Sequence, residues 1–397
     1  MKIFFTVTTL LVLLSAAGCA PETESMDQVI EKGLERATVQ CENMARSLLD
    51  KKELLPRSVD TLGNLSTSDS RWWTSGFFAG SLWYIYENMG DSKFLEYARE
   101  YTARVEKEQF ATDHHDLGFM IYCSFGNGLR VTGDKAYIPI ILQASESLST
   151  RFNPGAGVIK SWDEHNDKWP YPVIIDNMMN LEMLSWASKN SNNDKYANIA
   201  IMHADKTMDN HYRSDYSCYH VVGYDALTGE AIQKNTNQGY SDESSWARGQ
   251  AWGLYGFTMM SRESGELKYL LFAENIARYL LNHPNLPEDK VPYWDYDDPT
   301  IPNAPRDASA AAIMASGLIE LSQLTNDKSL AEQCIATAET ILRTLTSDEY
   351  LAQPGENANF VLKHSVGNMP LNLEIDVPLV YTDYYYIEAL MRYRKLL

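Results

Sequence analysis

Two aspartates, each placed just ahead of an apolar run, are the strongest candidates for chemistry in this chain. Asp116 stands in "HHDLGFM" and Asp176 in "VIIDNMM". A carboxyl group serves as a general acid only when burial or a second carboxylate raises its pKa towards the working pH. Two aspartates at the starts of neighbouring helices can supply that pairing. The pattern therefore indicates acid–base catalysis by this pair of carboxyls.

The same residues also fit a purely structural role. Aspartate is a favoured helix N-cap, and the helix dipole lowers the pKa of a capping carboxyl, which opposes use as a general acid. Six residues stand where caps belong, and they are Ser75, Asp116, Asp176, Asp242, Asp307 and Asp383. We expect Asp116 to be both a cap and a site residue.

Aromatic and basic residues gather in the same segments. Seven of the nine tryptophans lie in or beside these loops, and they are Trp72, Trp73, Trp162, Trp169, Trp246, Trp252 and Trp294. Flat indole faces suit the C–H surfaces of sugars, although burial as core is the alternative for each of them. Arg248 begins an otherwise apolar helix, so it must point to the opening or pair with an acid. This set predicts a carbohydrate-binding site.

Motifs of other enzyme classes are missing from the sequence. There is no HExxH, no phosphate-binding glycine loop and no GxSxG. The "HHD" run lacks a partner at metal-ligand spacing, and "DYDD" is only a weak calcium pattern. We therefore expect no metal and no cofactor. The net charge of −19 argues against nucleic acid as a partner.

The elements that must position these residues form an internal repeat. Five turns, "NMGDSK", "VTGDKA", "NSNNDK", "ESGELK" and "LTNDKS", each separate two helical patterns. Glycine or asparagine suits the end of one helix, and the acid suits the start of the next. Helices before the turns are rich in small and aromatic residues, whereas those after them are amphipathic. With a first amphipathic helix at about 26–50 and a last apolar one from 383, six inner and six outer helices result.

A closed (α/α)6 toroid is the simplest all-α fold for this pattern. An open helical solenoid is the alternative, but its repeats are usually shorter and more regular. We expect one catalytic domain over residues 26–397. The loops that enter the inner helices are long and rich in Trp and Asp, while the opposite turns are short, so function is expected on the inner-helix N-terminal face.

The first 18 residues read as a targeting segment. Lys2 precedes an apolar run too short to span a bilayer, and small residues lead to Cys19. "SAAGC" resembles a bacterial lipobox, with Ala16 where leucine is usual, so we expect an exported protein that is either periplasmic or a lipoprotein anchored through Cys19. The other cysteines, Cys41, Cys123, Cys218 and Cys334, lack CxxC spacing and are predicted to be free thiols, mostly buried.

Several stretches together resemble unsaturated glucuronyl hydrolases, glycoside hydrolase family 88. They are "WWTSGFFAG", "HHDLGFM", "IIDNMMNLEML", "NQGYSDESSWARGQAWGLYGF", "RDASAAAIMASGLIEL" and "DYYYIEAL". The resemblance implies an (α/α)6 barrel and release of 4,5-unsaturated uronic acid from the non-reducing end of lyase-generated glycosaminoglycan oligosaccharides of chondroitin, hyaluronan or heparin type. In that reaction an aspartate protonates C4 of the vinyl ether, water adds at C5, and the hemiketal opens.

Residue by residue, the resemblance implies that Asp176 is the acid/base and Asp116 the second essential aspartate. It places Trp73, His115, Trp162, His220, Gln238, Arg248 and Trp252 at substrate-contact positions, and Ser365 near the next sugar. Asn237 departs from the usual "HQGY". The alternatives are an unsaturated rhamnogalacturonyl hydrolase acting on pectin fragments and a non-catalytic surface lipoprotein that binds sugars.

Overall fold

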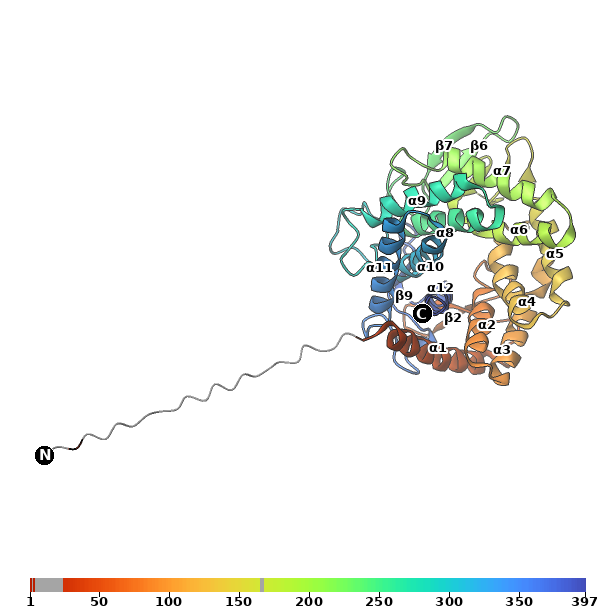
Figure 1. Ribbon diagram of the computed structural model, residues 1–397. Coiled ribbons are helices and arrows are strands. Elements are labelled where there is room, and N and C mark those ends of the chain that lie inside the picture. The colour runs from red at the N-terminus through yellow and green to blue at the C-terminus, as the bar shows by residue number, and fades with distance from the viewer. Residues whose placement is uncertain (2, 4–23, 165–167) are drawn as a thin grey trace.

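The chain closes into a ring of paired helices. The computed structural model describes Met1, Ile3, residues 24–164 and residues 168–397. Within them, six outer helices alternate with six inner helical segments around a common axis (Figure 1). The outer helices are α1 Met26–Leu48, α3 Ser92–Ala103, α5 Tyr137–Ser149, α7 Lys195–Asn210, α9 Leu267–Leu281 and α11 Lys328–Leu345. The predicted (α/α)6 toroid is confirmed.

The inner segments are less regular than the outer ones. The inner α-helices are α2 Phe77–Met89, α4 Asn127–Thr132, α6 Leu181–Ser191, α8 Ala247–Ser264, α10 Ala308–Leu324 and α12 Val380–Arg394. A π-helix, Gly118–Gly126, leads into α4, and a 3-10 helix, Ile175–Asn180, leads into α6. The π-helix begins two residues after Asp116, and the 3-10 helix contains Asp176.

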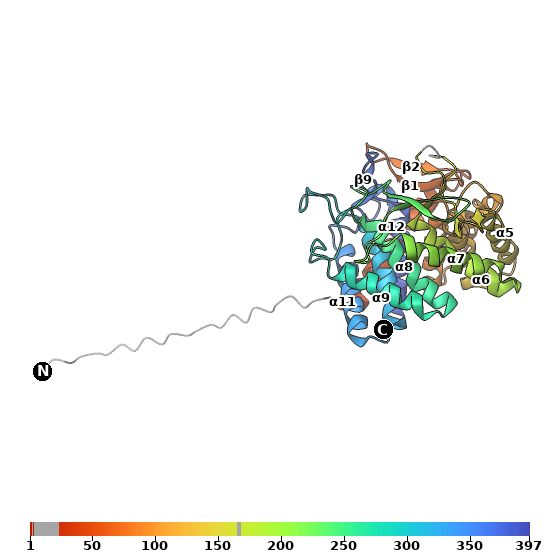
Figure 2. The same ribbon diagram turned by 90° about the horizontal axis from the view of Figure 1, so that it is seen from above.

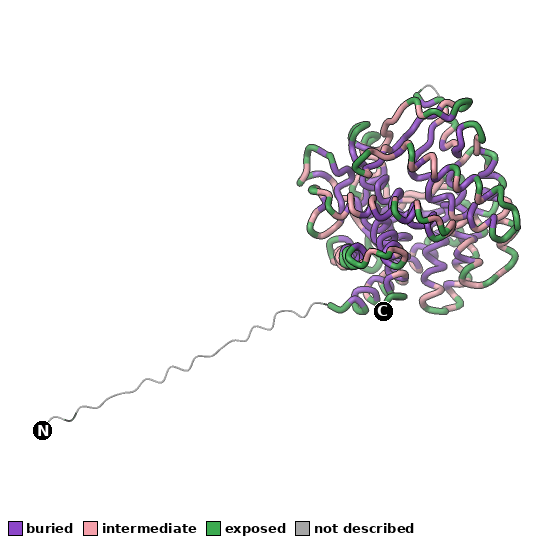
Figure 3. The backbone as a smooth tube through the Cα atoms, turned by 45° about the horizontal axis from the view of Figure 1, so that its top comes forward, coloured by how far each residue is buried: buried purple, intermediate pink, exposed green. Residues whose placement is uncertain are grey.

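Burial separates the two rings as the sequence predicted. Helix α10 is buried from Ala308 to Ile319, whereas α3 buries only one face, including Phe94, Ala98 and Tyr101. The tube in Figure 3 shows buried backbone inside and exposed backbone along the periphery. Apolar inner helices therefore form the core, and amphipathic outer helices cover it.

The short turns between inner and outer helices follow the predicted chemistry. Gly90, Gly133 and Gly265 end α2, α4 and α8 in the left-handed conformation, with φ of 69°, 70° and 73°. Asn192 ends α6 in the same way. These residues tolerate positive φ, so these four inner helices stop at the residue that the sequence indicated, whereas α10 ends at Thr325 in an extended conformation.

Small antiparallel sheets form the end of the ring opposite these short turns. They were not predicted from the sequence. They pair β1 Leu55–Val59 with β2 Leu65–Ser68, β3 Phe152–Asn153 with β4 Val158–Ile159, β5 Pro172–Ile174 with β6 Val221–Tyr224 and β7 Ala231–Asn235, and β8 Ser365–Asn368 with β9 Leu373–Val377. Strands β1, β2 and β9 lie at one end of the ring, and the C-terminus lies at the other (Figure 2). The long loops thus form one elaborated face.

The capping prediction is wrong for five of its six residues. Only Asp307 accepts a hydrogen bond from the first turn of its helix, from the Ser309 N–H. The side chains of Ser75, Asp116 and Asp176 make no such bond, Asp242 binds Asn235 and Thr236, and Asp383 accepts N–H bonds from Val361 and Leu362. The Asp116 and Asp176 side chains therefore do not cap their helices.

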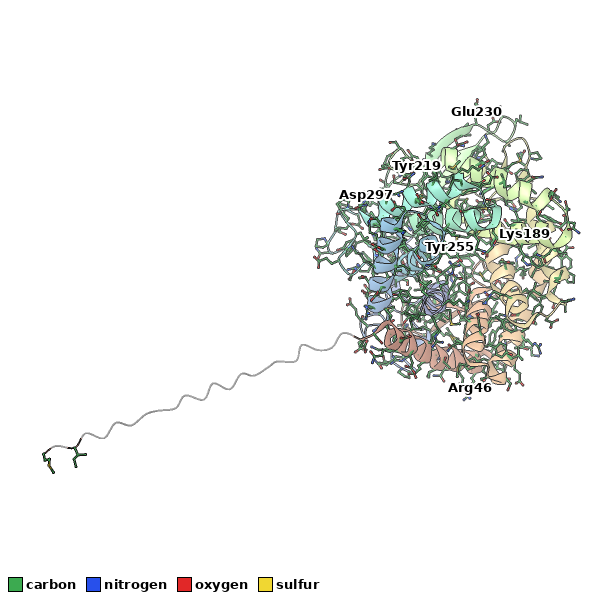
Figure 4. All side chains as sticks on the ribbon, in the orientation of Figure 1. Arg46, Lys189, Tyr219, Glu230, Tyr255 and Asp297 are labelled. Carbon is green, nitrogen blue, oxygen red and sulfur yellow. The ribbon has the colours of Figure 1, made fainter. Side chains whose placement is uncertain are left out.

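An aromatic layer divides the interior of the ring. Ring centroids of Phe77, Phe119, Trp252 and Tyr385 follow one another at 5.2–5.9 Å. On the side of the inner-helix C-termini lies a chamber of about 850 Å³, lined in part by Tyr255, which is labelled near the middle of Figure 4. This chamber is lined by neither Asp116 nor Asp176.

The four cysteines in the described part of the chain are free thiols, as predicted, with Cys123 only partly buried. In residues 24–164 and 168–397 we find no helix with the length and apolar character that crossing a membrane requires. Cys19, and the targeting segment 1–18 apart from Met1 and Ile3, lie outside the described residues.

Candidate active site

Asp116 and Asp176 come together from neighbouring inner segments. Asp116 ends the loop ahead of the π-helix, and Asp176 is the second residue of the 3-10 helix. They are 6% and 8% exposed, so both carboxyls are almost removed from water. Burial and the charge of Asp176 hold the pKa of Asp116 well above its usual range. The pair therefore retains a proton to higher pH than ordinary aspartates do.

Three neighbouring side chains surround the Asp116 carboxyl. The His115 Nε2 atom lies 3.1 Å from its Oδ1 atom, and the Asn180 side-chain amide donates to the same oxygen at 3.3 Å. His114 stacks on His115, with ring centroids 5.7 Å apart. Burial lowers the pKa of His115 well below its usual value, so that imidazole stays neutral.

Burial also raises the pKa of Asp176, to about 6. The positive charge of Arg248 acts in the opposite direction, because it favours the ionised carboxylate. A carboxyl with this pKa can donate a proton near neutral pH and take one back. Asp176 thus has the acidity that a general acid/base needs.

His220 faces Asp176 as a fixed hydrogen-bond donor. Its Nδ1 atom accepts the backbone N–H groups of Asn237 and Gln238, at 3.2 and 3.1 Å. Burial holds the pKa of His220 well below its usual value, so the neutral ring must carry its proton on Nε2. That Nε2 lies 3.8 Å from Asp176 Oδ2, and neither atom has a hydrogen-bond partner among the residues that the structure describes. Both can bind one oxygen atom of a substrate or of water.

Arg248 is almost buried, at 1% exposure, and pairs with an acid. Its guanidinium lies 3.2 Å from the Asp307 carboxylate and donates to the carbonyls of Val366 and Gly367. Gln238 donates to the Gly367 carbonyl as well, at 2.9 Å. Of the two alternatives for Arg248, pairing with an acid is the one present. Arg248 and Gln238 together hold the β8–β9 hairpin against the site.

The tryptophans divide into two groups. Trp169, Trp246, Trp252 and Trp294 are buried, which is the alternative that the sequence left open for each tryptophan. Trp72 is 37% exposed, and Trp73 and Trp162 are partly buried. Trp73 packs on Tyr381 at 4.9 Å, and Trp162 meets the His220 ring edge to face at 6.2 Å. Trp73 and Trp162 remain the indoles of the predicted substrate set that are partly accessible.

Ser365 does not present its hydroxyl to the opening. It is fully buried in β8, and its Oγ atom bonds to the Thr382 hydroxyl at 2.8 Å. The expectation that Ser365 contacts a second sugar is therefore at odds with this arrangement. The burial of this first residue of the β8–β9 hairpin could not be predicted from the local sequence.

Two residues near the carboxyls were not singled out from the sequence. Asn180 bonds to Asp116, and the Tyr381 ring lies 5.4 Å from the Arg248 guanidinium. Asn180 stands four residues after Asp176 in "DNMMN", a polar residue in an apolar run, and that spacing was the available signal. Tyr381 carried no such signal.

One group of side chains near the carboxyls has the composition of a metal site. Ligand atoms of His114, His115 and Asp116 lie within 4.8 Å of one another. The His114 Nδ1 atom, however, accepts the backbone N–H of Asp116 at 3.1 Å, so it is already committed. Carboxyls with raised pKa and neutral imidazoles fit proton transfer on a sugar.

Comparison with known proteins agrees with this geometry. The model of Glycosyl Hydrolase Family 88 matches residues 55–349. An unsaturated glucuronyl hydrolase of Formosa agariphila is 47% identical over 329 residues, which is 83% of this chain and 81% of that protein. An unsaturated chondroitin disaccharide hydrolase of Streptococcus agalactiae is 34% identical over 336 residues, 82% of each chain.

A solved structure shares the whole ring. The crystal structure of an unsaturated glucuronyl hydrolase specific for heparin superposes with a TM-score of 0.90 at 48% identity, covering 93% of this chain and 98% of that one. A family match over most of the ring, at this level of identity, means that the chain belongs to glycosyl hydrolase family 88.

Proposed function

We propose that this enzyme releases 4,5-unsaturated uronic acid from the non-reducing end of lyase-generated glycosaminoglycan oligosaccharides. The observation that carries the proposal is the nearly buried pair Asp116–Asp176, whose pKa values are both raised. Protonated Asp176 gives its proton to C4 of the C4=C5 vinyl ether, and positive charge develops at C5 and the ring oxygen. The Asp176 carboxylate then takes a proton from the water that adds at C5. The hemiketal opens and releases the remaining sugar.

The other site residues have supporting roles in this scheme. The neutral His220 Nε2–H and Asp176 Oδ2 bind the incoming water between them. Asp116 contacts the sugar hydroxyls, and Trp73 and Trp162 lie against the faces of the sugar. Each role depends on side chains whose burial and protonation are fixed by the loops on this face.

The test is the variant Asp176→Asn, which preserves shape but removes the proton donor. We expect turnover of unsaturated disaccharides to fall about 10²–10⁴-fold, the usual contribution of general acid–base catalysis. Asp298→Asn is the matched control, because Asp298 is also buried but bonds to Trp294 and Thr300 instead. An Asp176→Asn enzyme within about tenfold of wild type would remove Asp176 from the acid/base role.

For the substrate, we propose a preference for heparin-type unsaturated disaccharides over chondroitin-type ones. Support comes from the higher identity to the structure described as specific for heparin, 48%, than to the chondroitin disaccharide hydrolase, 34%. A panel of unsaturated disaccharides that differ in linkage and sulfation tests this preference. Consumption of rhamnogalacturonan fragments alone, or binding without loss of the double bond, would contradict the proposed activity.

We further propose export and lipid attachment at Cys19, from the targeting segment alone. Labelling cells with a radioactive fatty acid should mark the wild-type protein and not a Cys19→Ala variant. Equal labelling of the two would exclude that anchor.

A further inference from the structure

The side-chain amide of Asn180 has a defined orientation. Asn180 is the last residue of the 3-10 helix and is 1% exposed. Its Oδ1 atom accepts the backbone N–H groups of Gly118 and Phe119, at 2.8 and 3.3 Å. Turning the amide over would point its NH2 group at two N–H donors, so the network fixes the assignment. The Nδ2 group must therefore face the Asp116 carboxyl, to which it donates at 3.3 Å.

The backbone makes this contact close. A Cβ atom on Gly118 would lie 2.6 Å from both the Cα and the Oδ1 atoms of Asn180, so no side chain fits there. Gly118 begins the π-helix, an irregularity that is frequent at functional sites. Asn180 thus hydrogen-bonds both to the first turn of the π-helix and to the Asp116 carboxyl just ahead of that helix.

The same short helix also carries the other carboxyl. Asp176 and Asn180 stand four residues apart within Ile175–Asn180. The element that presents Asp176 therefore also fixes the place of Asp116.

We propose that Asn180 is a positioning residue, which orients the Asp116 carboxylate relative to Asp176 by donating a hydrogen bond to it. The inference rests on the proposed function for its meaning in catalysis. The electrostatics agree, since burial and Asp176 raise the pKa of Asp116 while the Asn180 N–H favours its ionised form.

The decisive variant is Asn180→Asp. The introduced carboxylate can still accept the N–H groups of Gly118 and Phe119, but it donates to Asp116 only when protonated. We expect kcat to fall at least about tenfold at pH 8, because small misplacements of catalytic groups cost up to about 10²-fold. The ratio of variant to wild-type kcat should rise as the pH falls towards 5. KM should change less than kcat.

A role limited to holding the π-helix gives a different result. In that case Asn180→Asp would have a pH profile parallel to wild type, and Asn180→Ala would lower the melting temperature with kcat retained. Either outcome overturns the proposal. Asn127→Ala is the matched control, because Asn127 is also buried on an inner helix but donates to Cys123 and Tyr384. It should lose stability while keeping the wild-type pH profile.

A readout independent of turnover separates this inference from the proposed function. With ¹³C-labelled aspartate carboxyls, the Asp116 signal is assigned by its loss in Asp116→Asn. Its titration midpoint should move to higher pH in Asn180→Ala, whether or not the wild type consumes a given disaccharide. An unchanged midpoint would refute the assignment, while absence of turnover by the wild type would refute only the proposed function.

Discussion

Turnover should decline steeply with rising pH, because the proton donor is a carboxyl that ionises near pH 6. Asp176 has its pKa raised to about 6 by burial, and kcat/KM reports the ionisation of the free enzyme. The protonated fraction is then about 0.9 at pH 5, about 0.5 at pH 6 and about 0.01 at pH 8. We expect kcat/KM to fall roughly ninetyfold between pH 5 and pH 8.

The assay follows the ultraviolet absorbance of the vinyl-ether double bond, at substrate concentrations far below KM and constant ionic strength. Circular dichroism at each pH excludes unfolding as the cause of any loss. A rate that stays constant from pH 6 to pH 8 would show that ionisation of Asp176 does not limit the reaction.

Three further outcomes can be measured by urea unfolding. Arg248→Met leaves the fully buried Asp307 without its cation, so the unfolding free energy should drop by about 3–5 kcal/mol, and an unchanged value would mean the pair adds nothing. Gly256→Ala places a Cβ 2.5 Å from that of Met178 and should cost about 1–3 kcal/mol, part of which Met178→Gly restores, because glycine removes the opposing Cβ; a gain in stability from Gly256→Ala alone would refute the close contact. Burial lowers the pKa of His203 to about 3, below the unfolded value near 6.5, so its contribution is present above pH 6.5 and lost as the pH falls towards 3. His203→Asn should flatten that loss by up to about 1.4 kcal/mol per pH unit, and identical slopes for the two proteins would contradict it.

The ring itself was predictable because its signals are local. Turn residues such as Gly90 and Gly265 mark helix ends through their own backbone conformation, and the periodicity of each helix tells which face is buried. Asp116 and Asp176 could be singled out because each begins an apolar run. Neither inference required knowledge of distant segments.

What the sequence could not disclose depends on partners far along the chain. Asp383 looks like a cap, but its carboxylate binds backbone N–H groups of Val361 and Leu362, about twenty residues earlier. Arg248 was expected at a substrate-contact position, but its guanidinium pairs with Asp307 and donates to two carbonyls of the β8–β9 hairpin. The short strands were missed for the same reason, since their pairing links residues that no local pattern joins.

Closure of the ring has an evolutionary consequence. The last helix, α12, packs against α1 and α2 (Figure 1). A Cβ on Gly33 of α1 would lie 2.4 Å from the Tyr386 hydroxyl. An open stack of repeats can gain or lose a unit at either end, because each unit touches only its neighbours. Here the first and last units are neighbours, so a seventh helical pair would have to break that joint. Descendants of this chain can therefore diversify by lengthening or exchanging loops on the elaborated face, while the number of repeats stays at six.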